Sequence, residues 1–158
     1  MGSCNAALVI ETTKMLWMGD KPVSQFKLSK KSKTNMALVH PDLVEVVERA
    51  IELTPYDFGI NSTTFRTHEE QAHLVATGKS KTMNSRHVPD NNECCLSCAI
   101  DFNVYVGGKL TWDIKYFRKV AQAFVTAAIE KGIDIELGCL WESFVDGPHI
   151  ELSRRLYP

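Results

Sequence analysis

The sequence predicts a single domain of the α+β class, in which a small antiparallel sheet packs against helices. Its 158 residues, 44% of them apolar and 23% charged, suffice for one hydrophobic core but leave no room for a second catalytic domain. Strand-like and helix-like segments do not alternate in the order that a parallel sheet requires, and no internal repeat is present. One strand candidate is followed by Gly107-Gly108, a typical hairpin turn.

The first half of the chain is predicted to form a helix, a strand and a second helix. A proline suits the first position of the helix predicted over residues 41–54, where apolar residues recur at helical spacing. Residues 58–65 have the composition of a strand. Thr67 and Glu70 form a capping-box signature, which starts a helix that extends to Gly78.

The second half begins with a long polar segment, and long loops in compact domains often carry function. Apolar residues at helical spacing then predict the longest helix of the chain, which Gly132 ends. The predicted elements are, in order, a loop over residues 79–98, a strand over 99–106, the long helix from 114, and short strands over 133–137 and 149–152.

The charge of the chain and the character of its amino-terminal residues limit the partners that we expect. Residues 1–25 show no clear periodicity and are predicted to be an amino-terminal extension, with the catalytic domain in residues 26–158. The net charge of -1 gives no general attraction to nucleic acid. Apolar residues 6–10 are too few for a signal-peptide core, and no segment approaches membrane-spanning length. We therefore expect a monomer that folds in the cytoplasm, without a membrane or nucleic-acid partner.

The segment Asp146-Gly147-Pro148-His149 indicates metal-dependent hydrolysis. A carboxylate stands three residues before a histidine, and Gly-Pro braces both. A zinc peptidase needs a neutral imidazole on the metal and a nearby carboxylate that takes a proton from water. One histidine cannot bind zinc tightly, so further ligands are expected elsewhere in the chain.

The other four histidines differ in their suitability as ligands. His40 precedes a helix and is expected to cap it or lie on the surface. His68 and His73 are five positions apart on one helix and so do not share a face. His87 lies in the polar loop just before the strand that contains Asp101. Taken alone, Asp101 is better explained by a position on the solvent-facing side of the sheet than by a role as ligand.

Seven short motifs, taken in order, resemble one known family over residues 26–152. They are Phe26-Lys27-Leu28-Ser29, His40-Pro41-Asp42-Leu43, Arg66-Thr67-His68-Glu69-Glu70-Gln71, Gly78-Lys79-Ser80-Lys81-Thr82, Ser85-Arg86-His87, Ala99-Ile100-Asp101 and Asp146-Gly147-Pro148-His149-Ile150-Glu151. The family is that of zinc-dependent peptidoglycan peptidases, which includes phage L-alanyl-D-glutamate endopeptidases and D-alanyl-D-alanine carboxypeptidases. The chain looks most like the phage endolysin branch.

The resemblance implies a single zinc site at the sheet edge. It makes His87, Asp101 and His149 the Zn²⁺ ligands and Asp146 the general base, with Ser85 binding substrate or supporting a ligand. Two imidazoles and one carboxylate leave zinc a net positive charge, which acidifies water. The base must lie within hydrogen-bond reach of that water.

Three further residues are expected around the site. The resemblance implies that Arg66 holds the developing oxyanion or a substrate carboxylate; the alternative is a surface salt bridge to Glu69 or Glu70. Glu151 faces the same side of its strand as the last histidine, so it supports that ligand or contacts substrate. Trp141 is expected to pack under the site rather than to touch substrate.

The chain departs from the family pattern between the first two ligands. His87 and Asp101 are 14 positions apart, whereas the family normally separates them by about seven. The favoured hypothesis is a loop inserted between two intact ligands, since residues 99–102 keep their strand character and loops accept added length at little cost.

Cysteines near these ligands leave two further hypotheses open for this spacing. The chain has five, an odd number, and three of them lie within five positions, so a disulfide framework is not expected. One of these thiolates can replace Asp101 on zinc. Alternatively, the cluster binds a further metal, with Cys139 as a fourth donor, or senses redox state. The clustered residues are Cys94, Cys95 and Cys98.

The resemblance predicts a zinc metallopeptidase that cleaves the L-alanyl-D-glutamate bond of peptidoglycan stem peptides. Such a protein would be a phage endolysin, made in the host cytoplasm and acting on the wall after its release. Three alternatives stay open: a D-alanyl-D-alanine carboxypeptidase, a wall amidase that uses a clustered cysteine with His149, and a zinc-stabilised binding module without activity.

Overall fold

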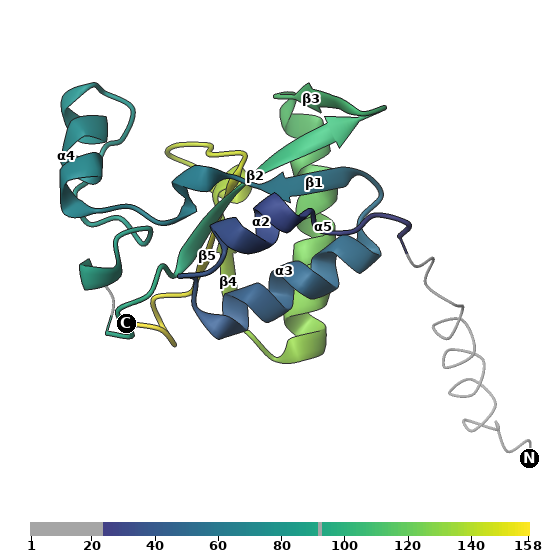
Figure 1. Cartoon of the computed structure of the whole chain (residues 1–158), viewed down its shortest axis with the longest axis horizontal. Helices are drawn as coiled ribbons and strands as arrows, with labels where there is room; N and C mark the ends of the chain where they lie inside the picture. The colour runs from purple at the N-terminus through teal and green to yellow at the C-terminus, as the bar shows by residue number, and fades with distance from the viewer. Residues whose placement is uncertain (1–23, 92) are drawn as a thin grey trace, which may run out of the picture.

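The computed structural model describes residues 24–91 and 93–158, and the predicted α+β class is confirmed (Figure 1). Most of the predicted extension, residues 1–23, lies outside the described residues. Five antiparallel strands form one small sheet, and helices cover it. Among the described helices, none is both long enough and apolar enough to cross a membrane.

The sheet has the strand order β1-β2-β5-β4, with β3 paired to the outer end of β2. The long strand β2 pairs with β1 through residues 102–105 and with β5 through residues 99–101. Gly107 and Gly108 both have positive φ, as the tight turn between β2 and β3 requires. The strands are β1 (Asp57–Ile60), β2 (Ala99–Val106), β3 (Lys109–Thr111), β4 (Ile135–Leu137) and β5 (His149–Leu152).

The strand predicted over residues 58–65 is shorter than expected. β1 ends at Ile60, and Ser62–Thr64 forms a single 3-10 turn, η1. The side chain of Asn61 starts that turn, because its Oδ1 accepts a hydrogen bond from the Thr63 amide at 3.4 Å. The turn brings Thr64 back under β2, where its side chain is fully buried.

The described residues contain four α-helices, whose ends follow local signals. His40 caps α3 through its Nδ1, as expected, and the capping box of Thr67 and Glu70 is present at the start of α4. The sequence does not predict the short helix α2, because its six residues are polar throughout and carry no apolar period. The helices are α2 (Lys30–Asn35), α3 (Pro41–Leu53), α4 (His68–Ala76) and α5 (Ile114–Lys131).

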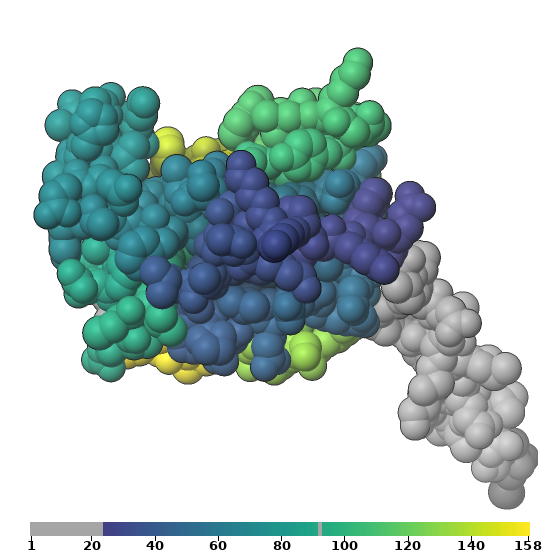
Figure 2. All heavy atoms as spheres, in the orientation of Figure 1, coloured from purple at the N-terminus to yellow at the C-terminus, as the bar shows by residue number. Residues whose placement is uncertain are grey.

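The core lies between the sheet and the pair α3 and α5. Phe58 of β1 and Phe102 of β2 contact each other and Phe124 of α5, with ring centroids 5.0 to 5.9 Å apart. Helix α4 packs differently: it lies at one end of the molecule, away from α3 and α5 (Figure 1). Figure 2 shows the segment of α4 and the β2-β3 hairpin rising on either side of a hollow.

Candidate metal centre

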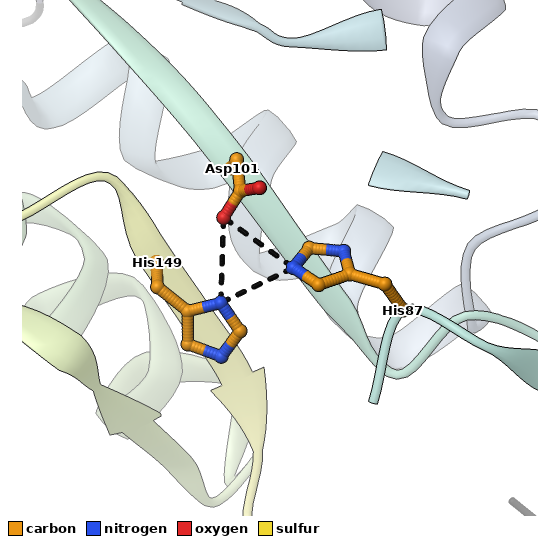
Figure 3. Close-up of side chains that lie close together, drawn as sticks. All are labelled: His87, Asp101 and His149. Atoms are coloured by element: carbon orange, nitrogen blue, oxygen red, sulfur yellow. Dashed lines mark hydrogen bonds and ion pairs between the residues drawn. The ribbon is translucent and has the colours of Figure 1, made fainter. Parts of the chain in front are cut away.

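Three side chains from separate parts of the chain converge on one point (Figure 3). His87 comes from the loop after α4, Asp101 from β2 and His149 from the start of β5. Asp101 and His149 are directly opposite each other in the antiparallel register. Because β2 and β5 are inner strands, the group lies where these two strands pair rather than on an outer strand. The His87 and His149 side chains are buried, and the Asp101 side chain is 12% exposed.

The converging atoms form a nearly equilateral triangle. His87 Nε2 lies 3.2 Å from His149 Nδ1 and 3.4 Å from Asp101 Oδ1, and the third side, from His149 Nδ1 to Asp101 Oδ1, is 3.3 Å. Zinc bonded at about 2.0 to 2.1 Å to three corners of a tetrahedron would separate its donor atoms by about 3.3 to 3.4 Å. The donor set and its spacing therefore fit a zinc ion without rearrangement.

Each histidine has an acceptor on its other ring nitrogen. His87 Nδ1 lies 2.8 Å from the carbonyl oxygen of Thr64, and His149 Nε2 lies 2.9 Å from a carboxylate oxygen of Glu151. A carbonyl or a carboxylate can only accept, so each of these nitrogens carries the proton. The remaining nitrogen of each ring is left with a lone pair for a metal, the usual arrangement around metal-bound histidines.

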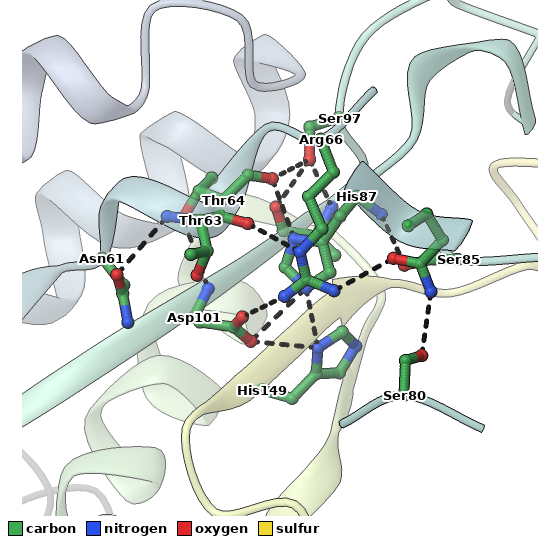
Figure 4. Close-up of polar contacts among 12 residues, drawn as sticks. Asn61, Thr63, Thr64, Arg66, Ser80, Ser85, His87, Ser97, Asp101 and His149 are labelled. Carbon is green, nitrogen blue, oxygen red and sulfur yellow. Dashed lines mark hydrogen bonds and ion pairs between the residues drawn. The ribbon is translucent and has the colours of Figure 1, made fainter. Parts of the chain in front are cut away.

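Asp101 is oriented in the same way by Arg66 (Figure 4). Arg66 Nη2 donates to Asp101 Oδ2 at 2.7 Å, which leaves Oδ1 available to a metal ion. Its Nε donates to the Thr63 carbonyl at 2.9 Å, and its Nη1 donates to buried Gln71 at 3.3 Å. The geometry places Arg66 behind a ligand, in contrast to the surface salt bridge with Glu69 or Glu70 that helical spacing offered.

Burial and charge oppose each other in this group. Burial raises the pKa of Asp101, but the two histidines hold it well below its usual range. Burial lowers the pKa of His149, but Asp101 and Glu151 outweigh burial and raise it to about 9. Burial likewise raises the pKa of Glu151, and His149 lowers it below the ordinary value. The carboxylates therefore attract positive charge into the centre, whether a proton or a cation.

Asp146 lies at the same cavity, in the loop before β5. This cavity of ≈ 520 Å³ is lined by all three converging residues together with Arg66 and Asp146. Burial raises the pKa of Asp146, the residue expected to act as general base, and a raised pKa makes this carboxylate a stronger proton acceptor. Its backbone amide is held by the Gly138 carbonyl at 2.9 Å.

Gly138, just after β4, is required for the position of Asp146. A Cβ atom at residue 138 would lie 2.5 Å from the Asp146 carbonyl oxygen and 3.0 Å from His149 Cβ. No side chain fits this space without displacement of the loop. The sequence showed no sign of this role, since nothing local distinguishes Gly138 from other glycines.

Trp141, Ser85 and Glu151, the further residues expected around the site, all line the cavity. Trp141 packs against the ring of His149, with centroids 5.1 Å apart, and is half-buried. Ser85 is buried, and its hydroxyl accepts a hydrogen bond from the His87 amide at 3.3 Å. Glu151 contacts the ring of His149 directly.

The segment between His87 and Asp101 forms a separate loop, and both residues remain in the donor triangle. It contains the short turn η2 (Pro89–Asn91) and returns to the sheet at Ser97, whose hydroxyl donates to the Thr64 carbonyl at 2.8 Å. Within the described part of the chain, the grouping of donor side chains around the histidines includes Asp101 and no cysteine. This arrangement agrees with an inserted loop.

Sequence reasoning missed the residues that orient the ligands. Thr64 offers its carbonyl to both His87 and Ser97, and Gln71 joins Arg66 to the loop after α4 by donating to Ser80 Oγ and to the Thr82 carbonyl. Gln71 is the one buried residue of the short helix α4, and a polar residue on an otherwise unburied helix carries no sequence signal of burial, so it could not have been found from its neighbours.

Comparison with known proteins assigns the family. Residues 24–153 match the family described as phage L-alanyl-D-glutamate peptidase. The chain belongs to this family. It is 37% identical over 133 residues to an L-alanyl-D-glutamate peptidase of Escherichia phage T5, covering 84% of this chain and 93% of that protein.

Two further family relatives extend the comparison. A peptidase of the same name from Listeria phage A118 is 34% identical over 94 residues, which cover 60% of this chain and 30% of the relative. The crystal structure of the Serratia marcescens L-Ala D-Glu endopeptidase ChiX superposes with a TM-score of 0.72 at 31% identity, covering 83% of this chain and 93% of that one. The sequence match to the family and the structural match therefore agree.

Proposed function

We propose that this chain is a zinc-dependent endopeptidase that hydrolyses the L-alanyl-D-glutamate bond of peptidoglycan stem peptides. The triangle of donor atoms from His87, Asp101 and His149, with the side lengths of a zinc tetrahedron, is the observation that carries the proposal. The names of the relatives support the choice of bond. The three donor residues and Asp146 line one cavity, as a hydrolytic centre requires.

In this proposal the side chains divide the work of amide hydrolysis. When bound, zinc would supply Lewis acidity towards the scissile carbonyl and towards water. Asp146 accepts the proton of the attacking water and returns it to the leaving amine nitrogen. Arg66 holds Asp101, and Glu151 holds His149, so that the ligand atoms need not reorganise during the reaction.

The charges at the cavity suit an acidic peptide. Lys79 and Lys81 line it and contribute positive charge, whereas Arg154, which also lines it, is paired with Glu151 at 3.6 Å. The stem peptide next to an L-alanyl-D-glutamate bond bears carboxylates, which such a lining attracts. Lys81 also lies over the ring of Phe144, 4.2 Å from its centroid, so the two sides of the cavity meet at this pair.

The cysteine-nucleophile alternative has no structural support. Among the described residues that line the cavity, none is a cysteine. The ring of His149 contacts the other two donor residues of the triangle and also Glu151 and Trp141. A thiol mechanism needs a cysteine within hydrogen-bond reach of its base. The carboxypeptidase and the inactive binding module are distinguished by experiment.

The decisive experiment is digestion of purified peptidoglycan with mass-spectrometric identification of the new termini. The full chain should release a free D-glutamate amino group, lose activity with chelator and regain it with added zinc. Release of terminal D-alanine alone would assign the carboxypeptidase. If the protein binds zinc but produces no new termini, and Asp146→Asn cannot be distinguished from the wild type, only the binding module is left.

The proposal includes a biological setting. As a phage endolysin, the protein would be made in the host cytoplasm and reach the wall after release, with residues 26–158 as the catalytic domain and residues 1–25 as an extension. Expression inside a bacterial host, with and without a membrane-permeabilising partner, tests this setting: lysis should require both the permeabilising partner and an intact Asp146.

A further inference from the structure

The extra loop between the first two ligands contains a close pair of thiols. Cys94 Sγ lies 3.4 Å from Cys98 Sγ, although Cys94 is exposed and Cys98 is buried. Cys95 between them has φ of 53°, in the left-handed region, and this turn folds the chain back so that the two sulfurs meet. For an S–S bond to form, the two sulfurs must approach from 3.4 Å to about 2.05 Å.

Cys98 belongs to the framework that supports the metal ligands. Its amide donates to the carbonyl of Arg86, the residue before His87, at 2.9 Å, and its carbonyl accepts from the Leu152 amide of β5 at 2.9 Å. Cys94, in contrast, makes its side-chain contacts within the loop, to the Leu96 carbonyl and to Cys98. A bond between the two sulfurs would therefore tie the extra loop to the ligand framework.

The surroundings favour a disulfide over a second metal site. Two sulfurs alone do not complete a tetrahedral site, which takes four donors. Within the described residues, the donor groups close enough to share an ion are those of His87, Asp101 and His149, and Cys139 is buried elsewhere, beside Arg118. Each thiol of the pair therefore has the other as its reaction partner.

We propose that Cys94 and Cys98 form an intramolecular disulfide when the folded protein meets a low-molecular-weight disulfide. In the first step, exposed Cys94 attacks one sulfur of glutathione disulfide and releases one glutathione. In the second, Cys98 attacks the Cys94 sulfur of the mixed disulfide and releases the other. The two thiols lose two protons and two electrons, which reduce the glutathione disulfide to two molecules of glutathione.

Burial controls the rate of the second step. Burial, with the hydrogen bond to Cys94, raises the pKa of Cys98 to about 12, so little thiolate is present at neutral pH. The pair should consequently oxidise faster as the pH rises.

Cytoplasmic thiols are kept reduced, whereas the periplasm and cell surface are oxidising. We therefore expect the bond to form when the protein leaves the host cytoplasm. This timing rests on the proposed function, whereas the pairing of the two cysteines does not.

The test is peptide mapping of the full-length protein after exposure to glutathione disulfide and alkylation of the remaining thiols. Trypsin places all three clustered cysteines on residues 87–109, apart from Cys4 and Cys139, and chymotrypsin then cleaves after Leu96. A bond from Cys94 to Cys98 keeps the two chymotryptic pieces linked until dithiothreitol is added. We expect nearly complete linkage in the wild type and in the control Cys95→Ser, and none in Cys94→Ser.

Several results would overturn the proposal. Glutathione retained on Cys94, unlinked pieces that indicate a bond between Cys94 and Cys95, or loss of linkage in Cys95→Ser would each do so. Oxidation in guanidinium chloride at roughly 6 M should instead give a mixture of pairings, because the denatured chain has lost the native turn. Equal selectivity in the unfolded chain would show that the fold does not direct the pairing.

A second measurement tests whether the disulfide stabilises the folded protein. The oxidised wild type should unfold at a Tm higher than the reduced protein by roughly 2 to 6 °C, as expected for a short closed loop in a domain of this size. The Cys94→Ser protein should show no change with oxidant. An unchanged or lower Tm of the oxidised wild type would overturn the claim that the bond stabilises the ligand framework.

Discussion

Asp101 Oδ1 lies 3.3 Å from His149 Nδ1, although the two residues are 48 positions apart in the chain. They are register partners on neighbouring strands, so the pairing of β2 with β5 fixes one side of the donor triangle. Each of the two side chains is held from behind, Asp101 by Arg66 and His149 by Glu151. Metal affinity at this centre should therefore depend on the supporting residues as well as on the ligands.

Loss of the Asp101 charge should abolish metal binding. Asp101→Asn keeps the shape of the side chain but removes the negative ligand atom, so we expect less than about a tenth of the wild-type zinc content after dialysis. Zinc stoichiometry by elemental analysis measures the effect. Asp90→Asn, at an exposed position of the extra loop, is the matched control and should retain full zinc. Equal zinc in both variants would exclude Asp101 as a ligand.

Glu151→Gln should weaken zinc binding without removing it. The amide can still accept from His149 Nε2, but it carries no charge to strengthen the imidazole as a donor. We expect the zinc Kd to rise by about 10- to 100-fold, as is typical for partners of ligating histidines. Competition with a chromogenic chelator gives the Kd. If the wild-type Kd persists in Glu151→Gln, the contact has no role in the metal centre.

Asp146 should set the acid limb of the pH profile. As general base it works only when ionised, and burial raises its pKa above 3.8, the ordinary value. Activity should therefore disappear as pH falls through a value higher than that of an exposed aspartate. Asp146→Asn should lower kcat/KM by about 10² to 10⁴-fold while keeping zinc. A pH series of kcat/KM, paired with zinc analysis, checks both.

The same carboxylate should limit stability. A folded-state pKa above the unfolded value means that the folded protein binds the proton more tightly, so this group favours folding at low pH and opposes it once pH exceeds the folded pKa. Asp146→Asn should accordingly raise the Tm at pH 7 relative to the wild type, with the difference shrinking as pH is lowered. Thermal unfolding of the metal-free proteins at two pH values measures it; a lower Tm at pH 7 would contradict the prediction.

Gly138→Ala should damage activity through packing alone. The added Cβ would lie 2.5 Å from the Asp146 carbonyl oxygen, so the loop that carries Asp146 must move. A displacement of about 1 Å at a catalytic group lowers activity by about 10²-fold. Gly59→Ala is the matched control, because its Cβ would meet neighbours at ordinary distances of 3.4 and 3.6 Å. Comparable kcat/KM for the two variants would show that the loop yields without cost.

Much of the architecture was predictable because its signals are local. The capping box at Thr67, the glycine pair after β2 and the apolar period of α5 each act within a few residues, and the structure has these elements where the signals predict them. The exceptions were also local in cause: the Asn61 turn shortened β1, and α2 lacks an apolar face.

By itself, the sequence determined the order of the elements and, through motifs shared with a family, the residues proposed as ligands. Only the tertiary structure decided how those ligands are held. The contact between Arg66 and Asp101 spans 35 positions, and the contact between His87 and the Thr64 carbonyl spans 23. Such contacts arise when distant segments share one buried space, and no local pattern of residues records them. For the same reason, a separation of 14 positions between His87 and Asp101 is compatible with an intact donor triangle.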